Sequence, residues 1–139
     1  MNNIKNEENR KCIIQAIEKC INLGRNKFVI YTYGDLGKYT EKILREEYHL
    51  LPEYRIDNYK SDGKSILTLD EAAEQKNHEV VFLICSDNRK VFYEIRSAIY
   101  SKMREMFIVD IFEDRATNIF ALEDALQKIN TYVGELEYE

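Results

Sequence analysis

Hydrophobic and polar residues follow two periods along this chain, one typical of helices and the other of buried strands. Residues 4–22 place apolar side chains mainly three and four positions apart, which predicts an amphipathic helix that stops at Gly24. Further helical patterns occupy about 37–47, 69–75, 87–103 and 117–133. Runs rich in β-branched and aromatic residues predict strands at 27–33, 54–56, 66–67, 79–85 and 106–111.

Strands and helices alternate, and this alternation calls for a parallel sheet covered by helices on both faces. We expect a three-layer α/β domain with a mostly parallel sheet of about five strands and an extra N-terminal helix. A chain of 139 residues without a dividing linker is expected to be a single domain, 1–139. Its core would span 27–112, flanked by helices at 1–24 and 115–133.

Composition excludes several classes of protein. Acidic residues outnumber basic ones by 25 to 20, and the net charge of −5 argues against a nucleic-acid binder. No apolar run approaches the roughly 20 residues of a membrane span, and the first residues lack the apolar core of a signal peptide, so we expect a cytoplasmic protein. The three cysteines are expected to be reduced and mostly buried. The two histidines lie outside any zinc-ligand spacing, so no metal site is expected.

The segment Tyr31–Lys38 carries the most informative motif. Ligands of open parallel sheets collect at the carboxyl ends of the strands, where this strand-to-helix turn lies. The phosphate-binding pattern G-x-G-x-x-G would place glycine at 32, 34 and 37, and the chain has Thr32, Gly34 and Gly37. Amides at the helix start favour an anion, whereas Asp35 either opposes a phosphate or stabilises the helix. A phosphorylated ligand and a purely structural turn both remain open.

Other candidates follow the later strands. Asp57 comes 20 residues after Gly37, the interval at which an acidic residue binds a ribose, and Asn58 adjoins it. Both are equally suited to an exposed turn. Ser86 and Arg89 follow the fourth strand, where a hydroxyl or guanidinium group can contact a phosphate. Helix capping, by Ser86 or Asp87, is the commoner role at such a position.

A complete catalytic site is not visible in the sequence. The chain has no G-x-S-x-G elbow, no Gly-Lys-Ser/Thr phosphate loop and no Cys–His pair. Asp110 and Tyr33 are the only candidates for a catalytic acid or base. Asp110 either faces a pocket or joins a buried polar network. Tyr31 and Tyr33 either stack on a base or sugar, or are half-buried strand residues.

Four segments together resemble a family of small Rossmann-like domains in bacterial surface-polysaccharide enzymes. They are Phe28–Lys38, Arg55–Asn58, Ile66–Ala72 and Val80–Asn88. The resemblance is to the N-terminal domain of the sialic-acid and bacillosamine acetyltransferases (the PglD/NeuD type), and to modules attached to FkbM-type methyltransferases and glycosyltransferases. The usual family run is I-Y-G-A-G-x-x-G-K, then a strand ending in D-N and a T-P-E-E-L-like segment. The similarity covers roughly residues 27–112.

This resemblance implies a Rossmann-like fold that holds a nucleotide-sugar, with Gly34, Gly37, Asp57 and Ser86 as contacts. The chain departs from the family at Thr32, which stands in place of the first glycine. It also has no counterpart of the hexapeptide repeats and the histidine that carry acetyl transfer. The resemblance therefore implies a binding module more than an enzyme.

Three functions are compatible with these patterns. The first is a nucleotide- or nucleotide-sugar-binding module, non-catalytic or part of a larger enzyme, in bacterial polysaccharide biosynthesis. The second is an enzyme subunit that uses NAD or S-adenosylmethionine and is completed by a partner chain. The third is an interaction scaffold with a degenerate pocket, docked through its first and last helices to a partner or a second copy. A nucleotide-sugar and a dinucleotide both offer a diphosphate and a ribose, so the turn alone does not distinguish them.

Overall fold

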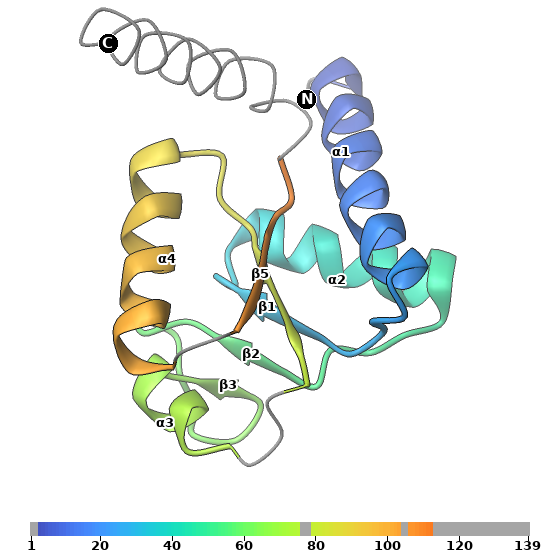
Figure 1. The fold of residues 1–139 in the computed structure, drawn as a ribbon. Helices are drawn as coiled ribbons and strands as arrows, with labels where there is room; N and C mark the ends of the chain where they lie inside the picture. Colours follow the sequence, from blue (N-terminus) through green and yellow to red (C-terminus); the bar gives the residue numbers. More distant parts are fainter. Residues whose placement is uncertain (1–2, 76–78, 104–105, 113–139) are drawn as a thin grey trace, which may run out of the picture.

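A computed structural model describes residues 3–75, 79–103 and 106–112 of the chain (Figure 1). The strands within these residues are β1 (Phe28–Tyr31), β2 (Tyr54–Ile56), β3 (Ile66–Leu67), β4 (Val81–Ile84) and β5 (Phe107–Asp110). The helices are α1 (Asn3–Asn22), α2 (Asp35–Tyr48), α3 (Leu69–Ala73) and α4 (Arg89–Lys102).

The strands form one five-stranded sheet in the order β3-β2-β1-β4-β5, and every neighbouring pair is parallel. The chain starts at the central strand β1 and moves outward through β2 to β3. It then returns to the other side of β1 and continues through β4 to β5. The direction of travel therefore reverses between β1 and β4, where the carboxyl ends of a sheet characteristically leave room for a ligand.

Helices cover both faces of this sheet, which makes a three-layer domain. Figure 1 shows α1 and α2 on one side, with α3 and α4 on the other. Alternating side chains of each strand serve the two layers: Phe28 and Ile30 of β1 pack with α1 and α2, whereas Val29 packs with α3 and α4. Both faces of β1 and β4 are buried, which explains why these strands read as continuous apolar runs.

Helix ends follow the local rules of capping. Thr68 caps α3 in a reciprocal capping box with Glu71. Gly24 follows α1 with φ of +80°, a conformation that glycine adopts without strain. The start of α4 differs from the sequence prediction, because neither Ser86 nor Asp87 caps it. Asn88 is the cap, and its side-chain oxygen accepts a hydrogen bond from the Val91 amide.

The predicted fold class is confirmed, and the sheet is parallel throughout rather than mostly so. Strands 54–56 and 66–67 have the predicted bounds, whereas β1, β4 and β5 are shorter than the apolar runs that predicted them. The predicted helix at 117–133 lies outside the described residues. Cys20 and Cys85 are buried and Cys12 is partly so, as expected. Over the described ranges, no helix combines the length and apolar character that crossing a membrane requires.

Candidate functional site

The carboxyl ends of β1 and β4 lie side by side at the point where the strand order reverses. Thr32, which directly follows β1, donates a hydrogen bond from its hydroxyl to the Cys85 carbonyl at 3.4 Å. This bond joins the two segments that leave the neighbouring strands. Thr32 therefore acts as a cross-link between β1 and β4, a role that glycine in the usual motif has no side chain to fill.

The two glycines of the turn have different reasons to be glycine. A Cβ atom on Gly37 would lie 2.1 Å from the Thr32 carbonyl oxygen, so α2 packs against the end of β1 only because this side chain is absent. Gly34 is the N-cap of α2, with φ of −89°, an angle open to any residue. A Cβ on Gly34 would have no atom within 4 Å. Packing thus requires Gly37, whereas Gly34 faces open space.

Asp57 is a buried carboxylate that links the end of β2 to the turn after β1. One of its oxygens accepts a hydrogen bond from the Tyr33 amide at 3.0 Å, and the other accepts one from the Tyr59 amide, also at 3.0 Å. Its neighbour Asn58 accepts a hydrogen bond from the amide of Leu69, the first residue of α3. Both side chains therefore brace backbone segments that meet at the carboxyl edge. An ionised carboxylate has about four acceptor positions, so Asp57 keeps capacity for a ligand hydroxyl.

Tyr33 is turned toward α2 and β2. Its hydroxyl donates to Glu41 at 2.9 Å, and the guanidinium of Arg55 lies 5.1 Å from its ring centroid. Arg55 and Glu41 also form an ion pair. Burial, followed by the hydrogen bond to Glu41, raises the pKa of the Tyr33 hydroxyl. Tyr31 lies inside the core with α3 and α4, so it is a strand residue, but it is buried rather than half-buried.

Arg89 and Asp110 meet at the carboxyl edge on the β4–β5 side. The guanidinium contacts both carboxylate oxygens of Asp110 and also donates to the Ser86 carbonyl at 3.1 Å. Asp110 further accepts a hydrogen bond from the Phe112 amide. The sequence left two options for Asp110, and the structure places it in a polar network. Arg89 ties the start of α4 to the end of β5, while Ser86 accepts a hydrogen bond from the Asn88 amide through its hydroxyl oxygen.

Two lysines place positive charge near the turn. The sequence analysis did not single out either of them. The Lys60 ammonium donates to the Tyr33 carbonyl at 3.3 Å, and the Lys38 ammonium lies 5.9 Å from the Tyr33 ring. Asp35, in the first turn of α2, is exposed and contributes a negative charge on the same side. Lys38 directly follows Gly37, so its place was readable from the motif. The place of Lys60 depends on how the loop after β2 folds back.

The candidate residues thus form two groups. Thr32, Gly34, Asp35, Gly37, Asp57 and Asn58 belong to one continuous region around the β1–α2 turn, through the contacts described above. Arg89 is bound to Asp110 on the β5 side. Ser86 lies between these groups, because the carbonyl of its neighbour Cys85 accepts the Thr32 hydrogen bond.

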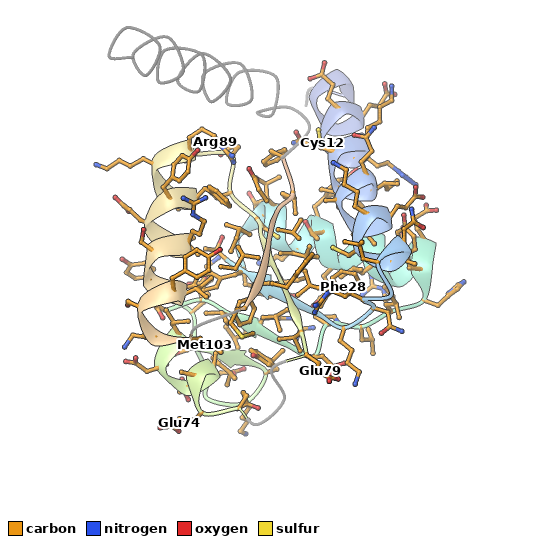
Figure 2. All side chains as sticks on the ribbon, in the orientation of Figure 1. Cys12, Phe28, Glu74, Glu79, Arg89 and Met103 are labelled. Atoms are coloured by element: carbon orange, nitrogen blue, oxygen red, sulfur yellow. The ribbon has the colours of Figure 1, made fainter. Side chains whose placement is uncertain are left out.

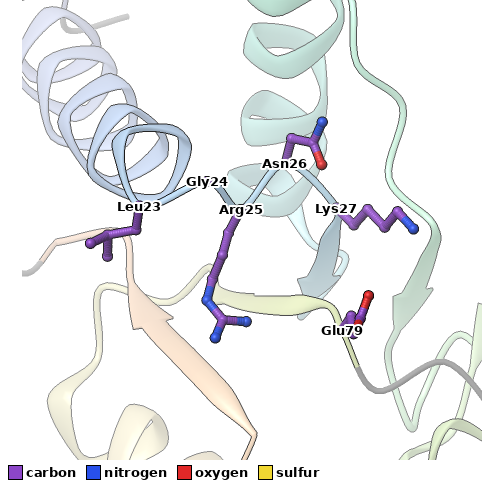
Figure 3. A pocket seen from close by; sticks show the side chains of 6 residues that line it. All are labelled: Leu23, Gly24, Arg25, Asn26, Lys27 and Glu79. Carbon is purple, nitrogen blue, oxygen red and sulfur yellow. The ribbon is translucent and has the colours of Figure 1, made fainter.

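A cavity of about 340 Å³ lies at the opposite, amino edge of the sheet (Figure 3). It is lined by the segment 23–27, which leads into β1, and by Glu79, which precedes β4. Figure 2 shows Phe28 and Glu79 at the end of the sheet away from Arg89. All six lining residues are exposed, so this is an open surface hollow. In the part of the chain that the structure describes, no group of three His, Cys, Asp or Glu side chains is arranged to hold a metal ion.

Comparison with known proteins adds no relative to this description. No family model, no curated protein and no solved structure matches the chain.

Proposed function

We propose that this chain is a nucleotide- or nucleotide-sugar-binding module whose ligand phosphate lies against the β1–α2 turn. The observation that carries the proposal is the contrast between the two glycines. Gly37 is explained by packing within the protein, but the absence of a side chain at Gly34 is not. No side chain caps the start of α2, and the first amides of a helix together with the helix dipole favour a phosphate.

The surrounding charges support an anionic ligand. Lys38 and Lys60 both contact Tyr33, the residue that precedes Gly34. The Asp57 carboxylate, directly after β2, already accepts hydrogen bonds from two backbone amides, which offset its charge. The exposed Asp35 is favourable to the helix start in the absence of ligand and is free to turn toward water when phosphate binds.

The contacts of the two candidate catalytic residues, Asp110 and Tyr33, favour a binding role without catalysis. Asp110 is held by Arg89, and the Tyr33 hydroxyl donates to Glu41. Neither side chain is thus poised for proton transfer to a ligand at Gly34. A place in bacterial polysaccharide biosynthesis rests on the family resemblance of the motifs, above all Gly34, Gly37 and the Asp57–Asn58 pair.

The experiment is a thermal-shift screen of the purified chain against UDP-, GDP- and CMP-sugars, NAD, NADP, S-adenosylmethionine and coenzyme A. A ligand at 100 times its Kd stabilises the folded state by about 2.7 kcal/mol, which raises Tm by about 9 °C in a domain of this size. A rise confined to one class of nucleotide would support the proposal and identify the class. A flat response to the whole panel would contradict it and favour the scaffold alternative.

A further inference from the structure

Three tyrosines come from the segments around the candidate site, and they differ in what their rings can contact. Tyr31 is 4% exposed and belongs to the core. Tyr33 is held by its hydrogen bond to Glu41, with cationic side chains over its ring. Tyr59 is 97% exposed. Of these three, therefore, only Tyr59 presents its ring to a ligand.

The backbone of Tyr59 is fixed next to the turn. Its amide and the Tyr33 amide are bound by the two oxygens of the same Asp57 carboxylate, each at 3.0 Å. The next residue, Lys60, reaches the Tyr33 carbonyl. The start of the loop after β2 is thus attached to the residue before Gly34 by two independent contacts. The backbone of Tyr59 is therefore held close to the residue that precedes Gly34.

The position of Tyr59 is distinctive among the large exposed hydrophobic residues of the described chain. Leu23 and Leu51 precede β1 and β2, so both lie at the amino edge of the sheet. Tyr100 lies near the end of α4, far along the helix from Arg89 at the carboxyl edge. Among the residues that the structure describes, Tyr59 alone combines large exposed aromatic surface with a place at the carboxyl edge.

We propose that Tyr59 is the stacking surface for the base of a nucleoside diphosphate whose phosphates bind at Gly34. This inference rests on the proposed function and names the part of the ligand that the loop after β2 recognises. The contacts described above hold Tyr59 by its backbone, so its side chain is free to rotate and can adjust to the base. Aromatic stacking accepts any base, because each base has a π-face. Asp57 then acts as a positioning residue, since it fixes the phosphate turn and the stacking residue relative to each other.

The test uses the absence of tryptophan from this chain. In the Tyr59→Trp variant, the introduced indole is the only tryptophan and reports directly on stacking through its fluorescence. The matched control is Tyr100→Trp, an exposed tyrosine of α4. Both variants are titrated with UDP, with ADP and with inorganic pyrophosphate, which carries the phosphates without a base. Thermal shifts of the wild-type chain with the same three compounds show which of them bind.

We expect any nucleotide that stabilises the wild-type chain to quench the Tyr59→Trp fluorescence at least twofold, with no change in Tyr100→Trp. Pyrophosphate should leave both signals unchanged. Tyr59→Ala should bind the nucleotide about tenfold more weakly than wild type. Its Tm without ligand should be unchanged, because the side chain is exposed.

Two results would overturn the inference while the proposed function stands. The first is nucleotide stabilisation of the wild type without quenching in Tyr59→Trp and with unchanged affinity in Tyr59→Ala. The second is equal quenching by pyrophosphate, which would mean a change of conformation rather than contact with a base. A wild-type chain that none of these nucleotides, nor any member of the wider panel, stabilises would refute the proposed function and this inference together.

Discussion

At the scale of single residues, the β1–α2 turn contains one glycine that packing requires and one that it does not. Gly37 admits the Thr32 carbonyl oxygen to a position that any Cβ would occupy, so its glycine belongs to the fold. Gly34 has no such neighbour. The sequence motif assigns the second glycine to the approach of a phosphate and the third to close packing of helix and strand, and the space around Gly37 shows this packing role.

The first prediction compares these glycines by substitution. Gly37→Ala should destabilise the protein by about 2 kcal/mol, because the new methyl group forces α2 and the end of β1 apart. Gly34→Ser should leave stability unchanged within about 0.5 kcal/mol, since serine is a good N-cap residue and its side chain enters open space. Urea denaturation of both variants measures the difference. Equal losses would mean that packing explains both glycines.

A second prediction concerns Tyr54, whose buried hydroxyl finds no hydrogen-bond partner in the described part of the structure. Burial, with a smaller effect of the Glu53 charge, raises the pKa of Tyr54 from 10.0 to about 12. Tyr54→Phe should stabilise the protein by about 1 kcal/mol at neutral pH, because it removes a buried polar group without a partner. Chemical denaturation at pH 7 measures this gain, and a loss of stability would contradict the assignment.

The same substitution has a pH dependence with a definite sign. Above pH 10 the unfolded tyrosine ionises, whereas the folded one keeps its proton up to about pH 12. The ionisation of Tyr54 thus leaves the free energy of unfolding unchanged below pH 10 and lowers it as the pH rises toward 12. Denaturation midpoints of Tyr54→Phe should therefore fall less steeply across this range than those of the wild type. Parallel curves for the two proteins would refute the raised pKa.

At the scale of elements, short polar side chains decide how helices join the sheet. Asp57 binds the β1–α2 turn to the end of β2, Asn58 binds the first amide of α3, and Asn88 caps α4. Arg89 and Asp110 then tie α4 to β5. Each contact lies at the carboxyl edge, so this edge is held by polar contacts while the body of the sheet is held by apolar packing.

Asn88 provides the prediction at this scale. Asn88→Ala removes the acceptor for the Val91 amide and should destabilise the protein by about 1 kcal/mol. Asp87→Ala is the matched control, because Asp87 is exposed and does not cap the helix. The thermal midpoints of the two variants measure the difference. A larger loss for Asp87→Ala would mean that Asp87, one of the two caps that the sequence predicted, caps α4 in place of Asn88.

Sequence patterns predicted the elements better than the contacts between them. The alternation of strands and helices was sufficient for the fold, and the glycine spacing was sufficient to locate the turn. Periodicity reports only neighbours within a few positions. The contact of Asp57 with Tyr33 joins residues 24 positions apart, so the bracing role of this carboxylate was not readable. Asn88 was missed because three polar residues in succession all suit a cap, and the choice depends on where the β4 strand ends.

At the scale of the whole molecule, one edge of the sheet combines open space, cations and an exposed aromatic ring. The reversal of strand order brings the ends of β1 and β4 together, and the loop after β2 adds Tyr59 and Lys60 beside them. The amino edge has a hollow of about 340 Å³ lined by exposed loop residues. The proposed ligand site lies at the carboxyl edge, where open α/β sheets characteristically bind their ligands.

The most direct test of this account is isothermal titration of the wild-type chain and Gly34→Leu with the nucleotide that raises the wild-type Tm most. A Cβ at this position has no atom within 4 Å, and the rest of a leucine side chain is expected to occupy the proposed phosphate position. The account predicts a folded Gly34→Leu variant, with a Tm within about 3 °C of the wild type, and a loss of at least a hundredfold in affinity. Unchanged affinity in a folded variant would contradict the claim that the ligand binds at this turn.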